Sequence, residues 1–141
     1  MDPIYRLVVD DDPDPAELAH LEERVATAAM TAAGLDPERD LAVFVRDERG
    51  SLLGGISGIT WGGYCELHAM WVDESVRGQG LARRLMTAAE DESRRRGCGQ
   101  VIFMAYDLLT PHLYERLGYE AVAVVDDCPT GSAARWFRKR L

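Results

Sequence analysis

The sequence predicts an α/β domain with a mixed sheet, and three observations favour this fold class. Segments with helical and with strand-like periodicity alternate along the chain. Tight turns at residues 47–50 and 62–63 join three consecutive strand-like segments, as in an antiparallel meander. Residues 101–105 form an unbroken apolar run, which is typical of a strand buried on both faces. The length of 141 residues fits one domain, so we expect a single domain over residues 1–141.

The chain begins with a predicted strand and a predicted long helix. Residues 4–9 alternate loosely and are rich in strand-forming side chains. Asp14 can then cap a helix, Pro15 suits its first position, and Glu17 completes a capping-box spacing. Gly34 ends this helix, after apolar side chains at helical spacing: Leu18, Leu21, Val25, Ala28, Ala29 and Ala32.

Three strands are predicted next, at residues 41–46, 52–60 and 64–72. The second of them is interrupted by three glycines, Gly54, Gly55 and Gly58. Glycines inside a strand either mark bulges or leave room for a ligand close to the sheet. The sequence leaves both interpretations open.

A second helix is predicted over residues 81–96 and ends before Gly97. Its apolar face carries Leu81, Leu85, Ala88 and Ala89. We expect its polar face to carry Glu90, Asp91, Arg94 and Arg95.

The sequence of the C-terminal part, residues 100–141, predicts three strands and one short helix. A strand at residues 100–106 is followed by a helix that Thr110 and Pro111 begin and Gly118 ends. The last two strands are expected at residues 119–125 and 134–139. Exposed edge strands such as the last one favour pairing between copies, so we expect a homodimer.

Composition and charge narrow the function classes. Three widely spaced cysteines without a CxxC pair predict reduced thiols and no metal site. The net charge of −8 argues against a nucleic-acid partner and fits a cationic substrate such as an amine. The first residues lack the pattern of a signal peptide, and no apolar run approaches the roughly 20 residues of a membrane span. We therefore expect a cytoplasmic protein without a membrane partner.

The most informative segment joins a predicted strand to the second helix. Its residues are Arg77, Gly78, Gln79, Gly80, Leu81 and Ala82. A helix N-terminus offers unpaired backbone N–H groups and a positive dipole end, and glycines permit close approach, so the turn suits a diphosphate. The pattern is neither a Walker loop nor a dinucleotide fingerprint. The alternative is that the glycines only shape a tight turn.

This segment resembles the (Q/R)-x-x-G-x-(G/A) signature of the GCN5-related N-acetyltransferases, the GNAT family. A second motif, Leu113-Tyr114-Glu115-Arg116-Leu117-Gly118-Tyr119, is similar to the family's F-Y-E-K-L-G-F segment. Further stretches resemble a subgroup of small bacterial members: Gly54-Gly55, Trp71-Val72-Asp73-Glu74, Gly97-Cys98 and Pro129-x-Gly131. The resemblance implies a mostly antiparallel, twisted sheet flanked by helices. In that fold the fourth and fifth strands, here residues 64–72 and 100–106, splay apart.

The resemblance also implies an acetyl-CoA site. Amides from Arg77 to Ala82 would hold the pyrophosphate, the pantetheine would enter the splay beside Trp71 and Val72, and the amide near Val72 would polarise the thioester carbonyl. Tyr114 would lie near the thioester sulfur and protonate the leaving thiolate. Without the motif, Tyr114 would be interpreted as a packing residue.

The general base is expected among Glu66 and His68. They lie two residues apart on one predicted strand and so face the same side. Amine attack needs a group that takes up a proton, directly or through water. Glu66 lies about where the family's glutamate base occurs, and His68 is the alternative. Both residues also have interpretations without a catalytic role: Glu66 as a solvated strand end and His68 as a half-buried imidazole.

The implied reaction is acetyl transfer from acetyl-CoA to a primary amine of a small molecule. Acetylation of a protein or peptide amine and a non-catalytic acyl-CoA sensor are the alternatives. The sequence departs from the subgroup's T-x-S-F-Q-A pattern at residues 105–110, which read Ala-Tyr-Asp-Leu-Leu-Thr. This stretch would border the acceptor pocket, so the subgroup's usual acceptor need not apply. Asp107 within it would either bind a cation or shape a turn.

Overall fold

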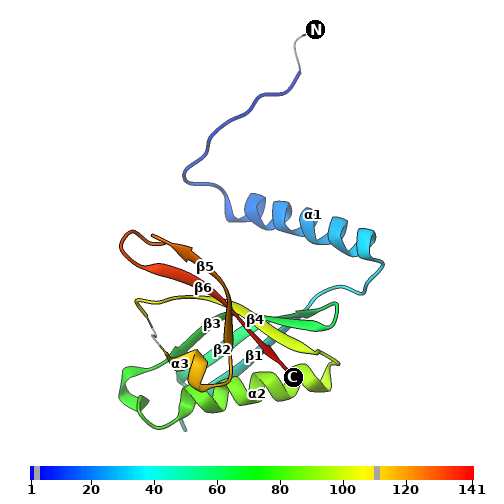
Figure 1. Ribbon diagram of the computed structural model, residues 1–141. Helices are drawn as coiled ribbons and strands as arrows, with labels where there is room; N and C mark the ends of the chain where they lie inside the picture. Colours follow the sequence, from blue (N-terminus) through cyan, green and yellow to red (C-terminus); the bar gives the residue numbers. More distant parts are fainter. Residues whose placement is uncertain (2–3, 110–111) are drawn as a thin grey trace. The chain divides into compact units, whose positions relative to one another are not determined.

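A computed structural model of the 141-residue chain describes residue 1, residues 4–109 and residues 112–141. The chain divides into two compact units, Met1–Pro37 and Glu38–Leu141 (Figure 1). The second unit contains every strand of the described residues and all of the predicted site. The two units are therefore treated separately below.

The first unit contains helix α1, Pro15–Ala33, as predicted. The Asp14 side chain accepts a hydrogen bond from the amide of Ala16 at 2.8 Å. Gly34 ends the helix in the left-handed conformation, with φ of 65°, and its amide donates to the Met30 carbonyl. The start and end of α1 thus follow from residues that the sequence displays.

The prediction of a strand at residues 4–9 is wrong. Among the described residues, this segment pairs with no strand, and all of its side chains are exposed. Strand-forming side chains favour an extended backbone, but a strand also needs a hydrogen-bonded neighbour. The segment has the first property and lacks the second.

The second unit is built on a six-stranded sheet in the order β1-β2-β3-β4-β6-β5. Only β3 and β4 pair in parallel, so the predicted fold class, a mixed and mostly antiparallel sheet, is confirmed. The strands span Arg39–Arg46 (β1), Leu52–Trp61 (β2), Tyr64–Val72 (β3), Gln100–Tyr106 (β4), Glu120–Asp126 (β5) and Ala133–Arg140 (β6). Because β6 lies between β4 and β5, it is not the edge strand that the sequence suggested; β1 and β5 are the edges.

Two α-helices and a short 3₁₀ helix complete this unit. The 3₁₀ helix, η1, spans Glu74–Val76 and leads into α2, Leu81–Arg95. Helix α3 spans Leu113–Arg116, and its predicted beginning at Thr110 and Pro111 lies outside the described residues. Among the described helices, none combines the length and the apolar character of a transmembrane span.

The glycines of β2 allow neighbouring backbones to approach closely. A Cβ atom on Gly58 would lie 2.1 Å from the Glu66 carbonyl oxygen, and one on Gly54 would lie 2.9 Å from the Trp71 carbonyl oxygen. The register between β2 and β3 shifts at Gly58, where Ser57 pairs with Ala69 but Gly58 pairs with Leu67. His68 is thus the extra residue of a bulge in β3. The bulge interpretation is thus supported at Gly58, while Gly54 permits the close approach of the β3 backbone.

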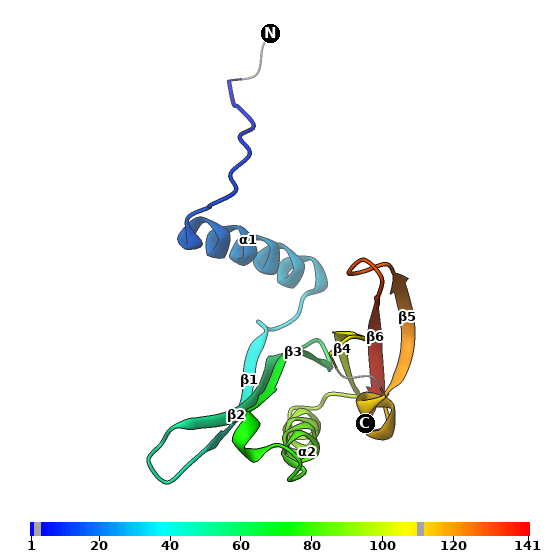
Figure 2. The ribbon, with the colours of Figure 1, turned by 90° about the vertical axis from the view of Figure 1, so that its left-hand side faces the viewer.

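The sheet splits between β3 and β4, as expected. The two strands pair only from Tyr64 to Glu66, opposite Gln100 to Ile102, and then diverge (Figure 2). Helix α2 packs on β1, β2 and β3, whereas α3 contacts β5. Each half of the split sheet therefore carries its own helix.

The core lies between these helices and the sheet. The largest fully buried side chains of the core include Leu41, Ile56, Leu85, Val101 and Cys65. Cys65 and Cys98 are buried free thiols, and burial raises the pKa of both. The prediction that Glu90 lies on the polar face of α2 is wrong, because Glu90 is only 5 % exposed.

Candidate active site

The turn before α2 has an open, glycine-lined backbone. Gly78 and Gly80 both have φ of 76°, a conformation that side chains disfavour. A Cβ atom on either glycine would have no atom of the described residues within 4 Å. No side chain in the described chain caps α2 at Gly80. The first amides of the helix therefore point toward free space and can receive an anion.

The strand before this turn is held in place by short-range hydrogen bonds. The Arg77 Nε donates to the Val72 carbonyl at 3.1 Å. Asp73 accepts hydrogen bonds from the hydroxyl and the amide of Ser75 at the start of η1, and these bonds lower the pKa of Asp73. Hydrogen bonds thus connect the end of β3 to η1 and to the turn.

A cavity of about 340 Å³ opens over the turn, between α2 and α3. It is lined by Val72, Val76, Arg77, Gly78, Gly80, Leu81, Ala82, Arg83, Leu113, Arg116 and Leu117. Trp71 and Gln79, which the sequence also proposed, do not line this cavity. Arg83 and Arg116 were missed, although two arginines beside a phosphate-binding turn add positive charge where a diphosphate needs it.

A second, narrow cavity of about 60 Å³ lies where β3 and β4 diverge. We call it the slot. It is lined by Ile56, Leu67, His68, Ala69, Met70, Met86, Phe103, Met104 and Tyr114. Phe103 belongs to the face of β4 that packs in the core, whereas Met104 is on the opposite, exposed face. The residues that line the slot therefore come from both faces of β4.

Tyr114 of α3 lies at the core end of the slot. Its ring contacts Phe103 edge-on, with ring centroids 4.5 Å apart, and lies 5.4 Å from Phe137. Among the described residues, its hydroxyl makes no hydrogen bond. The ring is fixed by packing while the hydroxyl is available to a bound group.

His68 lines the slot from β3, and Glu66 lies two residues before it on the same strand. The Nε2 atom of His68 is 3.9 Å from Oε1 of Glu66, so the two side chains do share one side of the strand. Glu66 belongs to the last residue pair before β3 and β4 separate, and His68 is the bulged residue that lines the slot. The imidazole of His68 and the ring of Tyr114 thus line the same slot, from β3 and from α3.

A third cavity of about 190 Å³ lies on the α3 side of β4 and β6. Tyr114 lines it together with Asp107 and Arg135, whose Oδ1 and Nε are 2.7 Å apart. This hydrogen bond raises the pKa of the Arg135 guanidinium. Asp107, which the sequence suggested as a cation ligand, is therefore already paired with a cation of the chain itself.

The fold, the turn and the slot define an N-acetyltransferase of the GNAT type, and the chain belongs to this family. The family described as Acetyltransferase (GNAT) family matches residues 1–119. The resemblance inferred from the two motifs is thereby confirmed.

Individual relatives agree with this assignment. The chain is 34 % identical over 112 residues to Acetyltransferase Atu2258 of Agrobacterium fabrum, covering 77 % of this chain and 79 % of the relative. It is also 34 % identical over 101 residues to Blasticidin-S acetyltransferase of Streptomyces morookaense, covering 71 % and 74 % of the two chains. A crystal structure of an Agrobacterium tumefaciens protein superimposes with a TM-score of 0.87 at 27 % identity, over 97 % of this chain and all of that one.

The protein is therefore an acetyl-CoA-dependent N-acetyltransferase. The described residues fit the donor, because the turn leaves its amides open and a slot lies where β3 and β4 diverge. Acetyl-CoA supplies an activated acetyl thioester when it is bound.

Proposed function

We propose that this enzyme transfers the acetyl group to a primary amine of a small molecule, with Tyr114 and the Glu66–His68 pair acting on opposite faces of the sheet. One observation carries the proposal: Tyr114 and His68 both line a single slot where β3 and β4 diverge. A group reaching through the slot meets a proton donor on one side and a proton acceptor on the other.

The donor would be held at the turn. Amides of Gly78, Gly80, Leu81 and Ala82 would bind the pyrophosphate, with Arg83 and Arg116 adding charge. The pantetheine arm would then follow Val72 toward the slot. Backbone N–H groups of β3 beside the slot would polarise the thioester carbonyl.

The chemical step forms a C–N bond and breaks a C–S bond. The amine nitrogen attacks the thioester carbon from the His68 side, and its proton passes to His68 or to Glu66, directly or through water. The thiolate leaves on the core side and takes its proton from the Tyr114 hydroxyl. The products are an acetamide and the free thiol of CoA, and proton exchange with solvent then returns the base and Tyr114 to their starting forms, so atoms and charge balance.

A cationic acceptor is favoured by the Glu66 carboxylate at the entrance and by the net charge of −8. The relative from Streptomyces morookaense is named for transfer to blasticidin S, which supports a small molecule as acceptor. Small-molecule acceptance is thus the best-supported version of the reaction.

An acceptor screen tests the proposal. The purified protein is incubated with acetyl-CoA and with small polyamines, amino sugars, aminonucleosides, peptides or a lysine-rich protein, and free thiol is measured. Release with small amines supports the proposal, and release only with peptides or protein replaces it by peptide acetylation. Tight acetyl-CoA binding without thiol release in any class would instead identify a sensor domain.

The base is identified by its pH dependence. If His68 takes the proton, His68→Gln lowers kcat at neutral pH by roughly 10²–10⁴-fold, and the loss shrinks at high pH where the free amine is populated. Glu66→Gln then lowers kcat less, since it only loses its contact with His68. The reverse order assigns the role to Glu66, and pH–rate profiles equal to the parent's would exclude both.

We also propose a cytoplasmic homodimer built from one domain per chain. The free cysteines and the acyl-CoA donor support a reducing compartment. Strand β5 is an edge strand with every residue exposed, so it is the candidate dimer contact. The family match over residues 1–119 crosses both compact units and supports a single domain. Light scattering of the purified protein measures the oligomeric state.

A further inference from the structure

The two parts of the donor site belong to different halves of the split sheet. The phosphate-binding turn begins α2, which packs on β1, β2 and β3. Tyr114 is on α3, which contacts β5 in the other half. Beyond three residue pairs, β3 and β4 do not hold these halves together. The distance between turn and tyrosine therefore depends on contacts that cross the split.

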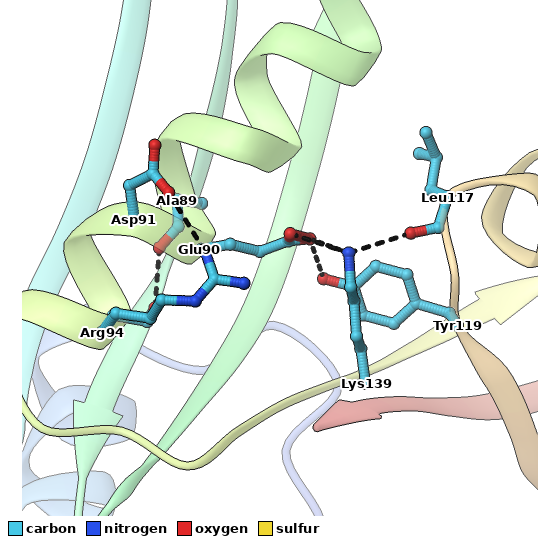
Figure 3. A network of polar contacts seen from close by, with 8 residues as sticks. Ala89, Glu90, Asp91, Arg94, Leu117, Tyr119 and Lys139 are labelled. Carbon is cyan, nitrogen blue, oxygen red and sulfur yellow. Dashed lines mark hydrogen bonds and ion pairs between the residues drawn. The ribbon is translucent and has the colours of Figure 1, made fainter. Parts of the chain in front are cut away.

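A buried polar cluster makes such a contact, and we call it the clamp. It consists of Glu90 on α2, Tyr119 just before β5, and Lys139 on β6 (Figure 3). The Tyr119 hydroxyl donates to Glu90 Oε2 at 2.9 Å, and Lys139 Nζ donates to Glu90 Oε1 at 2.9 Å. Lys139 Nζ also donates to the carbonyl of Leu117 at 3.1 Å.

The Leu117 carbonyl connects the clamp directly to the tyrosine helix. Leu117 caps the C-terminal end of α3, three residues after Tyr114, and its amide donates to the Tyr114 carbonyl at 3.1 Å. One ammonium group therefore joins α2 to the end of α3.

Two of the three clamp residues are buried, and the side chain of Lys139 is 27 % exposed. Glu90 is 5 % and Tyr119 is 4 % exposed. Burial, and then the charge of Glu90, raise the pKa of Tyr119, so its hydroxyl stays protonated and donates. A buried ion pair is often no more stabilising than well-packed apolar side chains of similar size. Stability alone therefore does not explain why this cluster is charged. The fixed directions of its hydrogen bonds explain it.

We propose that Glu90, Tyr119 and Lys139 are positioning residues that set the spacing between the phosphate-binding turn and Tyr114 across the split sheet. When the clamp is intact, the thioester sulfur of a donor anchored at the turn meets the Tyr114 hydroxyl. Without the clamp, the two halves keep their folds but lose this alignment, and a misplacement of about 1 Å can cost on the order of a hundredfold in rate.

The test replaces the whole clamp by apolar side chains of similar length: Glu90→Met, Tyr119→Phe and Lys139→Met in one protein. Because no buried charge is left alone, we expect its urea midpoint to match or exceed that of the parent. We expect kcat/KM for acetyl-CoA to fall about a hundredfold and the dissociation constant of CoA to rise severalfold. Lys139→Met alone leaves Glu90 unpaired and should lower the midpoint strongly.

Asp91→Asn with Arg94→Gln is the matched control, because it removes an exposed ion pair of 3.1 Å from the same helix without crossing the split. It should keep parental kinetics. If the stable triple variant also keeps them, the clamp is only structural and the proposal is wrong. If the triple variant does not fold, the same comparison is made with Tyr119→Phe, where parental kcat/KM and CoA affinity would likewise overturn it.

The proposal rests on the proposed donor site, so CoA binding by the parent protein is measured first. A parent that does not bind CoA contradicts the donor site itself. A parent that binds CoA, with an unaffected triple variant, contradicts only the clamp.

Discussion

Gly80→Asp should abolish CoA binding while the protein stays folded. The new carboxylate would lie where the pyrophosphate is held. At about 4 Å and an effective dielectric constant near 20, a like-charge pair costs about 4 kcal/mol, or roughly a thousandfold in the dissociation constant. Calorimetric titration with CoA measures the loss. A Cβ atom at Gly80 finds open space among the described residues, so the fold should tolerate the side chain apart from backbone strain.

Two variants separate charge from strain. Gly80→Ala introduces the same strain at φ of 76° without the charge, and should weaken CoA binding far less. Gly97→Asp places the same side chain at a φ of 83° at the far end of α2, and should leave CoA affinity unchanged. Equal loss of affinity in Gly80→Ala and Gly80→Asp would mean that backbone shape, and not an anion, defines this turn.

Tyr114→Phe should lower kcat by about 10²–10⁴-fold, the usual contribution of a general acid. The phenylalanine ring keeps the contacts with Phe103 and Phe137, and only the hydroxyl is lost. The KM for acetyl-CoA should therefore change little. Single-turnover measurements of thiol release report the chemical step directly.

Stability provides the control for Tyr114. Because its hydroxyl makes no hydrogen bond with the described residues, removing it should change the free energy of unfolding by no more than about 0.5 kcal/mol. A normal kcat with chemistry rate-limiting would return Tyr114 to the role of a packing residue. A large loss of stability would show that its hydroxyl has a structural partner.

Local signals in the sequence predicted the parts of the site that depend on neighbouring residues. Gly78 and Gly80 precede an amphipathic helix, and that order suggested an anion-binding turn, with a purely structural tight turn as the alternative; the structure contains an open turn there. Helix α1 was likewise predicted from Asp14 and Gly34, which cap it in the structure. In each case the relevant contacts lie within a few residues of the chain.

Features that depend on distant residues were missed. Glu90 was assigned to the polar face because it is charged, yet its partners are 29 and 49 residues away in sequence. Residues 4–9 have strand propensity, but no sequence rule states whether a partner strand lies beside them. The pairing of Asp107 with Arg135, 28 residues apart, could likewise not be predicted from the sequence.

The bulge at His68 also changes how β3 should respond to substitution. A strand normally keeps one parity of residue numbers inside, but a single inserted residue reverses it. Cys65 and Leu67 are buried before the insertion, whereas Met70 and Val72 pack against the core after it. Polar substitutions in β3 should therefore be tolerated at even-numbered residues before His68 and at odd-numbered residues after it. In β3, the parity change marks the place where the continuous, core-covering part of the strand ends and the slot begins.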